Sequence, residues 1–258
     1  MMENENRKPV VSVIMPAYNA ERFIEEAVAS VVNQSFTDWE LIIIDDGSKD
    51  ETVSVAKAIA QQDDRITVIC NQQNMGVART RNRGFDLAKG QWVALLDSDD
   101  IWHSDKLEKQ LELAEKTNAD IVYCSYGIVD INGEKAREPY ITLPQVSLED
   151  MLRQNYIGCS TVVMSEKITE KYRFVTDFYH EDYVMWTQIL KDGYKARGLT
   201  EVLADWRFIQ NSRSFNKIKA AKNRWLIYRK YLKLPLPKSI KSIVQYAFAG
   251  VRKYAKNG

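Results

Sequence analysis

Short apolar runs alternate with longer amphipathic stretches over the first hundred residues. Four runs are too short for helices and read as strands buried on both faces, at about 10–15, 39–44, 66–70 and 92–96. Between them, apolar positions recur at helical spacing and predict helices at about 20–32, 50–62 and 77–89. Repeated strand–helix alternation is typical of a doubly wound sheet. We therefore predict an α/β fold with a Rossmann-like, mostly parallel sheet flanked by helices.

The pattern is less regular after residue 105. It predicts a helix to about 116, a strand at 120–126 and a hairpin whose turn is Asn132-Gly133. A helix near 147–154, a strand near 160–164 and a helix from His180 to Gly193 follow. From about residue 215 the chain is helical again, in two amphipathic segments divided by prolines. The expected organisation is one domain over 1–214, with halves 1–105 and 106–214, and a basic helical extension over 215–258.

Composition fits a globular protein of ordinary kind. Hydrophobic residues make up 45% of the 258 residues. No apolar run approaches the ~20 residues that a membrane-spanning helix needs, and the polar stretch 1–8 has no signal-peptide character. Cys70, Cys124 and Cys159 are odd in number and lack metal-type spacing, which indicates reduced thiols and a cytoplasmic location.

Charge is distributed unevenly along the chain. The net charge is +1, yet no acidic residue follows Asp205 while 14 Lys and Arg residues do, so residues 1–205 carry −13. The basic segment could be a solvated face, a nucleic-acid arm or a surface that meets anionic lipid. Aromatic residues among its lysines favour an anionic membrane surface as the partner of segment 207–258. No nucleic-acid partner is expected, because the acidic body opposes a phosphate backbone.

Three carboxylates in four positions follow the run 92–96. Asp97, Asp99 and Asp100 repel one another unless a cation or a donor lies among them. They fall beyond the carboxyl end of a predicted parallel strand, where ligands collect in α/β sheets. Oxygen ligands suit a hard divalent cation that arrives with substrate phosphates. The alternative is that Asp100 or Ser104 caps the next helix and the other acids are solvated.

Further polar groups fall at the same predicted edge of the sheet. Asp45 and Asp46 end the strand 39–44 and could accept hydrogen bonds from a base or a ribose. Tyr18 follows the first strand and could stack on a base, or it could close the core as a loop aromatic. Arg79 and Arg81 begin a helix and could face phosphate, or lie on a solvated helix face.

Four motifs in order carry a family resemblance: 12–19, 40–50, 74–82 and 96–100, with a further motif at Glu181-Asp182. Together they resemble the family 2 inverting glycosyltransferases with the GT-A fold. Without the other motifs, Glu181 and Asp182 would simply be acids in the first turn of a helix, where they are favoured.

The resemblance implies roles for particular residues. It implies that nucleotide-sugar is bound by Pro16, Ala17, Tyr18, Asp46, Arg81, Asp97 and Ser98. It assigns Mn²⁺ or Mg²⁺ to Asp97 and Asp99, and the general base to Asp182. Acceptor-binding candidates are Glu181, Trp186 and Trp102. On this basis 1–105 is the nucleotide-binding half and 106–214 the acceptor half.

The expected activity is transfer of one sugar from a nucleotide-sugar, expected to be a UDP-sugar, to a glycan or lipid-linked acceptor. Family relatives of this layout build bacterial surface polysaccharides at the inner membrane face, so a peripheral location there is expected. The Gln-x-x-Arg-Trp motif of processive synthases is absent; the chain has Trp206-Arg207 and Ser212-Arg213-Ser214 instead. Alternatives are a sugar-phosphate nucleotidyltransferase and a non-catalytic sugar-nucleotide-binding module of a polysaccharide assembly complex.

Overall fold

The fold is described from a computed structural model that covers residues 8–178, 180–208 and 217–255. The polar N-terminal residues 1–7 and the Ser212-Arg213-Ser214 segment lie outside the described residues. Within them, the strands form one nine-stranded sheet with the order β3-β2-β1-β4-β8-β6-β9-β5, and β7 pairs with β6 beside this path.

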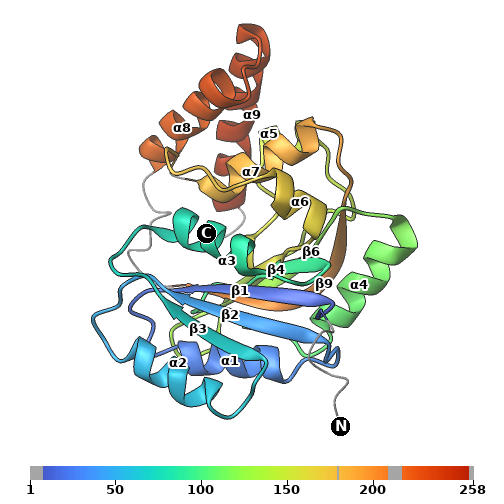
Figure 1. The fold of residues 1–258 in the computed structure, drawn as a ribbon. Helices are drawn as coiled ribbons and strands as arrows, with labels where there is room; N and C mark the ends of the chain where they lie inside the picture. The colour runs from blue at the N-terminus through green and yellow to red at the C-terminus, as the bar shows by residue number, and fades with distance from the viewer. Residues whose placement is uncertain (1–7, 179, 209–216, 256–258) are drawn as a thin grey trace.

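The first half of the chain builds the parallel part of the sheet (Figure 1). Its strands are β1 (Val11–Ala17), β2 (Trp39–Asp45), β3 (Ile66–Cys70) and β4 (Trp92–Leu95). Its helices are α1 (Ile24–Val32), α2 (Thr52–Ala60) and α3 (Val77–Leu87). Helices α1 and α2 lie on one face of the sheet and α3 on the other, as the alternation of strands and helices predicts.

The second half adds a mixed sheet. Its strands are β5 (Ile101–Trp102), β6 (Ile121–Val129), β7 (Lys135–Tyr140), β8 (Val163–Ser165) and β9 (Ala196–Arg207). Its helices are α4 (Lys106–Thr117), α5 (Leu148–Arg153), η1 (Cys159–Thr161), α6 (Glu166–Lys171) and α7 (Glu181–Lys191). Strand β8 runs antiparallel to both β4 and β6, whereas β6 and β9 are parallel. The predicted α/β fold with a largely parallel sheet flanked by helices is confirmed.

Alternate residues of each central strand feed two separate cores. In β1, Ile14 packs toward Phe85 of α3, whereas Val13 and Met15 pack toward Ile24 of α1. A strand buried on both faces needs apolar residues at every position, which is why these strands are continuous apolar runs in the sequence. Burial of both faces fixes the register and therefore the place where each strand ends.

The C-terminal segment comprises α8 (Lys217–Leu226), η3 (Ile227–Tyr231) and α9 (Leu236–Ala255). Ile227, Tyr228 and Leu232 are buried in the same core cluster as α7. The Tyr228 hydroxyl donates to the Leu152 carbonyl, and Lys191 Nζ donates to the Leu232 carbonyl at 3.1 Å. The segment is therefore packed against α5 and α7. None of the helices in the described ranges combines the length and apolar character needed to cross a membrane.

Lys106, the first residue of α4, lies inside the core. Lys106 is fully buried, and its Nζ donates to Gln110 Oε1 at 2.7 Å. The same atom lies 3.9 Å from the centre of the Trp102 ring. Burial lowers the pKa of Lys106 to about 8, because the charged form loses its hydration.

This burial predicts a pH-dependent stability. An unfolded lysine titrates near 10.5, so between about pH 8 and 10.5 the unfolded chain binds more protons and the stability contributed by Lys106 rises with pH. The substitution Lys106→Met removes the unfavourable free energy of burying a charged lysine, about 3 kcal/mol, which is fully present below pH 8. The stability of the variant relative to the native chain should therefore decline by that amount as the pH rises to 10.5. Urea unfolding across this range measures it.

The matched control is Lys116→Met on the exposed side of α4. Its stability relative to the native chain should be independent of pH. A constant difference for Lys106→Met as well would contradict the burial argument.

Candidate active site

A cleft of about 800 Å³ opens beyond the carboxyl ends of β1 and β4. Polar and charged side chains from both halves of the chain line it. Eight of the residues singled out by the sequence lie on its walls: Pro16, Tyr18, Arg81, Asp97, Ser98, Asp99, Glu181 and Asp182. The carboxylates after β4 and those at the start of α7 thus face one space, although some 80 residues separate them in the chain.

Arg81 joins the two groups of carboxylates. Its Nη2 lies 2.6 Å from Asp97 Oδ1, and its Nη1 lies 2.9 Å from Glu181 Oε1. The guanidinium is almost fully buried and lies over the ring of Phe174, 5.4 Å from its centre. Because two carboxylates occupy this guanidinium, Arg81 acts in the described structure as an ionic bridge between the halves and not as a free phosphate ligand.

The turn after β4 is held by a residue that no local motif identifies. Ser160 Oγ accepts a hydrogen bond from the Asp97 amide at 3.1 Å and donates to Asp100 Oδ2. Asp100 is buried and does not cap α4, whose N-cap position is Asp105. The capping interpretation of the acidic cluster is therefore wrong for Asp100. Ser160 lies in the short helix η1. Strand β8, predicted near 160–164, therefore begins only at Val163.

Burial gives the acids of this turn unusual protonation behaviour. It raises the pKa of Asp99 to about 6, and repulsion from Asp97 adds to the shift. Burial also raises the pKa of Asp100 well above its usual range, with Asp99 and Asp97 contributing. A carboxylate pair of this kind gains most from a nearby cation, since the cation removes both the repulsion and the cost of burying charge.

These donors fit a divalent cation that brings other ligands with it. No group of three or more His, Cys, Asp or Glu side chains is arranged as a metal site within the ranges the structure describes. The cleft does present two carboxylates, Asp97 and Asp99, and Mg²⁺ is commonly held by one or two carboxylates together with substrate phosphates and water. The residues present therefore fit a cation that is completed by a diphosphate.

Asp182 lies in the first turn of α7 and faces the same cleft. Burial raises its pKa, against the lowering effects of the Tyr183 backbone hydrogen bond and of Arg81. A carboxyl group with a raised pKa is a stronger base when ionised than an exposed aspartate. Glu181 contacts Arg81 instead, so the two neighbouring acids occupy different positions in the cleft.

Tyr18 is half-exposed at the rim, so its interpretation as a loop aromatic that closes the core is wrong. Four other predicted site residues do not line the cleft: Ala17, Asp46, Trp102 and Trp186. Ala17 is buried at the end of β1, where its carbonyl accepts from the Asp46 amide.

The Asp46 carboxylate is occupied by the loop before α3. It accepts hydrogen bonds from Asn71 Nδ2 and from the Met75 and Gly76 amides, each at 2.8 Å. Asp45 is different: its Oδ2 accepts from the Gly47 and Ser48 amides, but its buried Oδ1 has no hydrogen-bond partner among the described residues. Asp45 thus keeps one buried oxygen without a partner among the described residues, but like Asp46 it does not line the cleft.

The two tryptophans are corrections to the acceptor-binding prediction. Trp186 is fully buried and packs edge-on against Phe174 in the core. Trp102 is nearly as buried, and its Nε1 donates to the Ser160 carbonyl at 2.7 Å. Trp102 therefore supports the turn that holds Asp97, and neither ring is accessible to an acceptor.

Arg207 connects the acidic turn after β4 to helix α1 and to the hairpin between β6 and β7. Its backbone amide donates to Asp100 Oδ1 at 3.0 Å, and its Nε donates to the Asp99 carbonyl at 2.9 Å. Its Nη1 donates to the Asp130 carbonyl at 3.1 Å, and its Nη2 pairs with Glu26 of α1. The arginine is buried, so it is a structural centre and not part of a free basic surface.

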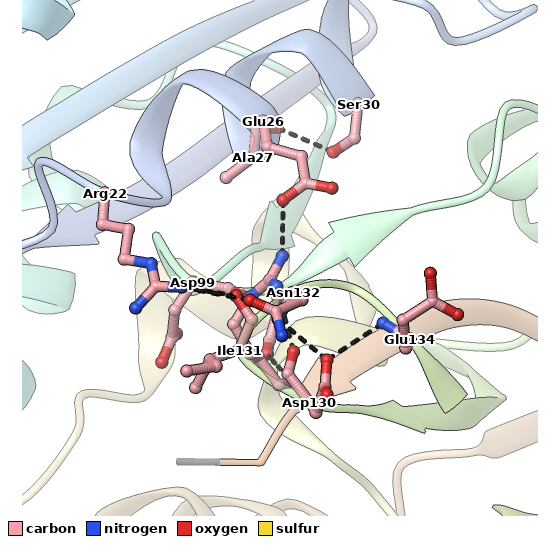
Figure 2. Close-up of polar contacts among 11 residues, drawn as sticks. Arg22, Glu26, Ala27, Ser30, Asp99, Asp130, Ile131, Asn132 and Glu134 are labelled. Atoms are coloured by element: carbon pink, nitrogen blue, oxygen red, sulfur yellow. Dashed lines mark hydrogen bonds and ion pairs between the residues drawn. The ribbon is translucent and has the colours of Figure 1, made fainter. Parts of the chain in front are cut away.

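Arg22 binds the same hairpin from the surface. Figure 2 shows Arg22 and Glu26 extending from the α1 region toward the turn that runs from Asp130 to Glu134. Arg22 Nη2 donates to Asn132 Oδ1 at 3.3 Å and to the Ile131 carbonyl at 3.4 Å, in an exposed position. The predicted Asn132-Gly133 turn is confirmed, and its contacts tie it to α1.

The α/β fold with a cleft at the strand ends is that of a GT-A glycosyltransferase, and comparison with known proteins agrees. The glycosyl transferase family 2 profile matches residues 12–172. TuaG of Bacillus subtilis, a glycosyltransferase assigned to teichuronic acid biosynthesis, is 39% identical over 96% of this chain and 98% of its own. The Escherichia coli β-1,3-glucosyltransferase WfgD, named for UDP-Glc and α-D-GlcNAc-diphosphoundecaprenol, is 35% identical over 96% and 98%. The chain belongs to glycosyltransferase family 2.

Solved structures agree on the fold. Residues 1–349 of S. aureus TarS in complex with UDP-GlcNAc match with a TM-score of 0.73 and 18% identity, over 92% of this chain and 71% of that one. The mannosyltransferase PcManGT of Pyrobaculum calidifontis, in complex with GDP-Man and Mn²⁺, matches with a TM-score of 0.70 and 19% identity, over 98% and 76%. The fold class predicted from the sequence is confirmed.

The contacts of Arg207 predict a large loss of stability when it is replaced. Arg207→Met leaves the Asp99 and Asp130 carbonyls without their donors and should cost about 2–4 kcal/mol in the free energy of unfolding. Arg22→Met removes an exposed contact with the same hairpin and should cost less than about 1 kcal/mol. Urea unfolding of both variants measures this difference, and equal losses would contradict the assignment of Arg207 as the structural centre.

Proposed function

We propose that this family 2 glycosyltransferase is a non-processive, inverting enzyme. It transfers one sugar from a UDP-sugar to a hydroxyl group of a glycan or lipid-linked acceptor in surface polysaccharide synthesis. The observation that carries the proposal is the convergence of Asp182 with Asp97 and Asp99 on one cleft. Inversion by single displacement requires a base and a leaving-group site at different places around the reacting carbon, and these two groups of acids meet that requirement.

The donor nucleotide would lie along the β1 and β4 ends of the cleft. Tyr18 is half-exposed there and offers a ring on which a base can stack. Asp97 and Asp99 would hold Mn²⁺ or Mg²⁺, which neutralises the charge that develops on the departing diphosphate.

Asp182 would accept the proton of the attacking acceptor hydroxyl. A positioned general base of this kind contributes roughly 10²–10⁴-fold to the rate. Arg81 holds Glu181 and Asp97 in place, so Asp182 is the acid of the α7 turn that remains for this task. WfgD is named for a diphosphoundecaprenol acceptor, which supports a lipid-linked acceptor for this chain.

We also propose that the C-terminal segment docks on an anionic membrane surface at the cytoplasmic face. Helix α9 exposes Leu236, Ile240 and Val244, which lie four residues apart and so share one face. Leu226 of α8 is exposed as well. Exposed lysines and arginines accompany these side chains in the segment: Lys222, Arg229, Lys230, Lys233 and Lys241. An apolar face edged by cations is the pattern of interfacial helices, and each cation contributes ~1 kcal/mol near anionic lipid.

Two substitutions separate donor binding from transfer. Asp99→Asn should reduce Mn²⁺-dependent UDP binding to its metal-free level, because a ligand of the cation is lost. Asp182→Asn should leave UDP affinity unchanged while sugar transfer from UDP-glucose falls roughly 10²–10⁴-fold. Calorimetry with UDP and an assay of UDP release with a GlcNAc-diphospholipid acceptor measure the two effects.

The exposed Asp64 supplies a control, and Asp64→Asn should change neither quantity. Unchanged UDP affinity in Asp99→Asn would refute the metal role, and an active Asp182→Asn would place the base elsewhere. UDP binding without transfer of any sugar from a panel of nucleotide-sugars would favour a binding module.

Membrane docking is tested by vesicle flotation of the full chain. The native protein should float with phosphatidylglycerol vesicles and not with phosphatidylcholine vesicles. Ile240→Asp combined with Val244→Asp should lower binding about tenfold or more, because two buried aliphatic contacts are lost. The matched control is Ile141→Asp, which is equally exposed but follows β7. No binding by the native protein, or equal effects of both changes, would rule out docking by α9.

A further inference from the structure

A buried arginine of the C-terminal segment lies directly behind the catalytic turn. Arg224 of α8 is 6% exposed. Its guanidinium carbon lies 3.5 Å from the ring centre of Tyr183 and 4.5 Å from that of Tyr246 on α9. Tyr183 follows Asp182 in the first turn of α7, and its hydroxyl is fixed by a 3.0 Å hydrogen bond to the Met151 carbonyl. The guanidinium is therefore stacked on the turn that carries the proposed base.

The charge of Arg224 is not matched by a contacting carboxylate. None of the ion pairs among the described residues includes it, and its buried Nη1 has no hydrogen-bond partner there. Burying an unpaired cation is costly unless its field stabilises something else. Stacking between two aromatic rings offsets part of that cost, and a nearby anion can offset more.

Asp182 is the acid that this field reaches. Burial raises the pKa of Asp182, and the positive charge of Arg224 opposes that rise; burial lowers the pKa of His180, the residue before α7, and Arg224 lowers it further. Other ionisable groups whose charge acts at Asp182, from α3, from the turn after β4, from β6, from η1 and from α7 itself, are Arg81, Asp97, Tyr126, Cys159 and Glu181. Arg81 is already paired with two of these acids, which leaves Arg224 as the cation without a competing carboxylate.

We propose that Arg224 is a positioning residue for the base: the C-terminal segment places a buried cation against Tyr183 in the first turn of α7, and this contact fixes the turn that presents Asp182 to the cleft. The inference rests on the proposed role of Asp182 and deepens it. It makes the segment part of the catalytic unit, in addition to any role at a membrane.

The direct test is a titration of Asp182 in the free protein. Carboxyl ¹³C resonances of labelled aspartate are followed with pH, and Asp182→Asn assigns the signal. In Arg224→Gln the Asp182 pKa should be higher than in the native chain, because a positive charge that lowers it is lost. Arg224→Lys keeps the charge and should keep most of the native value.

Two further variants control for net charge and for folding. Lys222→Gln removes one positive charge from an exposed position of the same helix and should leave the Asp182 titration unchanged. Arg224→Met is a second neutral variant that retains apolar packing between the two rings, should Arg224→Gln fail to fold. An unshifted titration in the neutral variants, or an equal shift in Lys222→Gln, overturns the proposal.

The same variants link the titration to catalysis. For UDP release from UDP-glucose with Mn²⁺ and a GlcNAc-diphospholipid, the acid limb of the kcat profile should move to higher pH in Arg224→Gln. Transfer below that limb should fall, with native rates at alkaline pH. A uniform loss at every pH indicates a merely structural role. A shifted titration with an active Asp182→Asn removes the proposed base, and not the effect of Arg224 on the Asp182 titration.

Discussion

A buried guanidinium between two carboxylates is the contact on which the cleft depends. Asp97 follows β4 and Glu181 begins α7, and Arg81 holds one oxygen of each. Without a cation at this point, the acids of both halves would repel one another across a partly buried space. Because Arg81 satisfies Asp97 and Glu181, Asp99 and Asp182 are left facing the cleft for other partners. One ion-pair bridge thus sets the positions of the groups that would do chemistry.

The sequence predicts this convergence because strand ends are determined by local patterns. Continuous apolar runs identify strands buried on both faces, and parallel neighbours end at one edge. It does not predict which way each side chain points. Trp186 lies four residues after Asp182 yet faces the core, and Trp102 is turned inward by the pairing of β5 with β9. Asp45 and Asp46 both bind loop amides, Asp45 those of Gly47 and Ser48 and Asp46 those of Met75 and Gly76.

The contacts that hold the acidic turn are long-range and carry no local signal. Ser160 binds a turn 60 residues earlier, and Arg207 binds one 107 residues earlier. Strand β9, which presents Arg207, lacks a regular apolar period because its pairing with β6 is interrupted by register shifts, so the pattern did not predict it. The net charge of the C-terminal segment likewise does not predict which of its cations are exposed. Arg207 and Arg224 belong to the basic C-terminal count, but both are buried and act on the cleft.

Segment 217–255 therefore has two kinds of cation with different tasks. Exposed lysines accompany the apolar face of α9, whereas Arg224 is enclosed between Tyr183 of the first turn of α7 and Tyr246 of α9. Residues of η3 also fill the core against α7, so removing the segment would open a cavity beside this turn as well as remove the cation that contacts it. The face that would meet lipid and the Tyr246 ring that contacts Arg224 lie on one helix. An anionic surface that fixes α9 would consequently also fix the cation beside this turn, which would tie the location of the enzyme to the geometry of its proposed base.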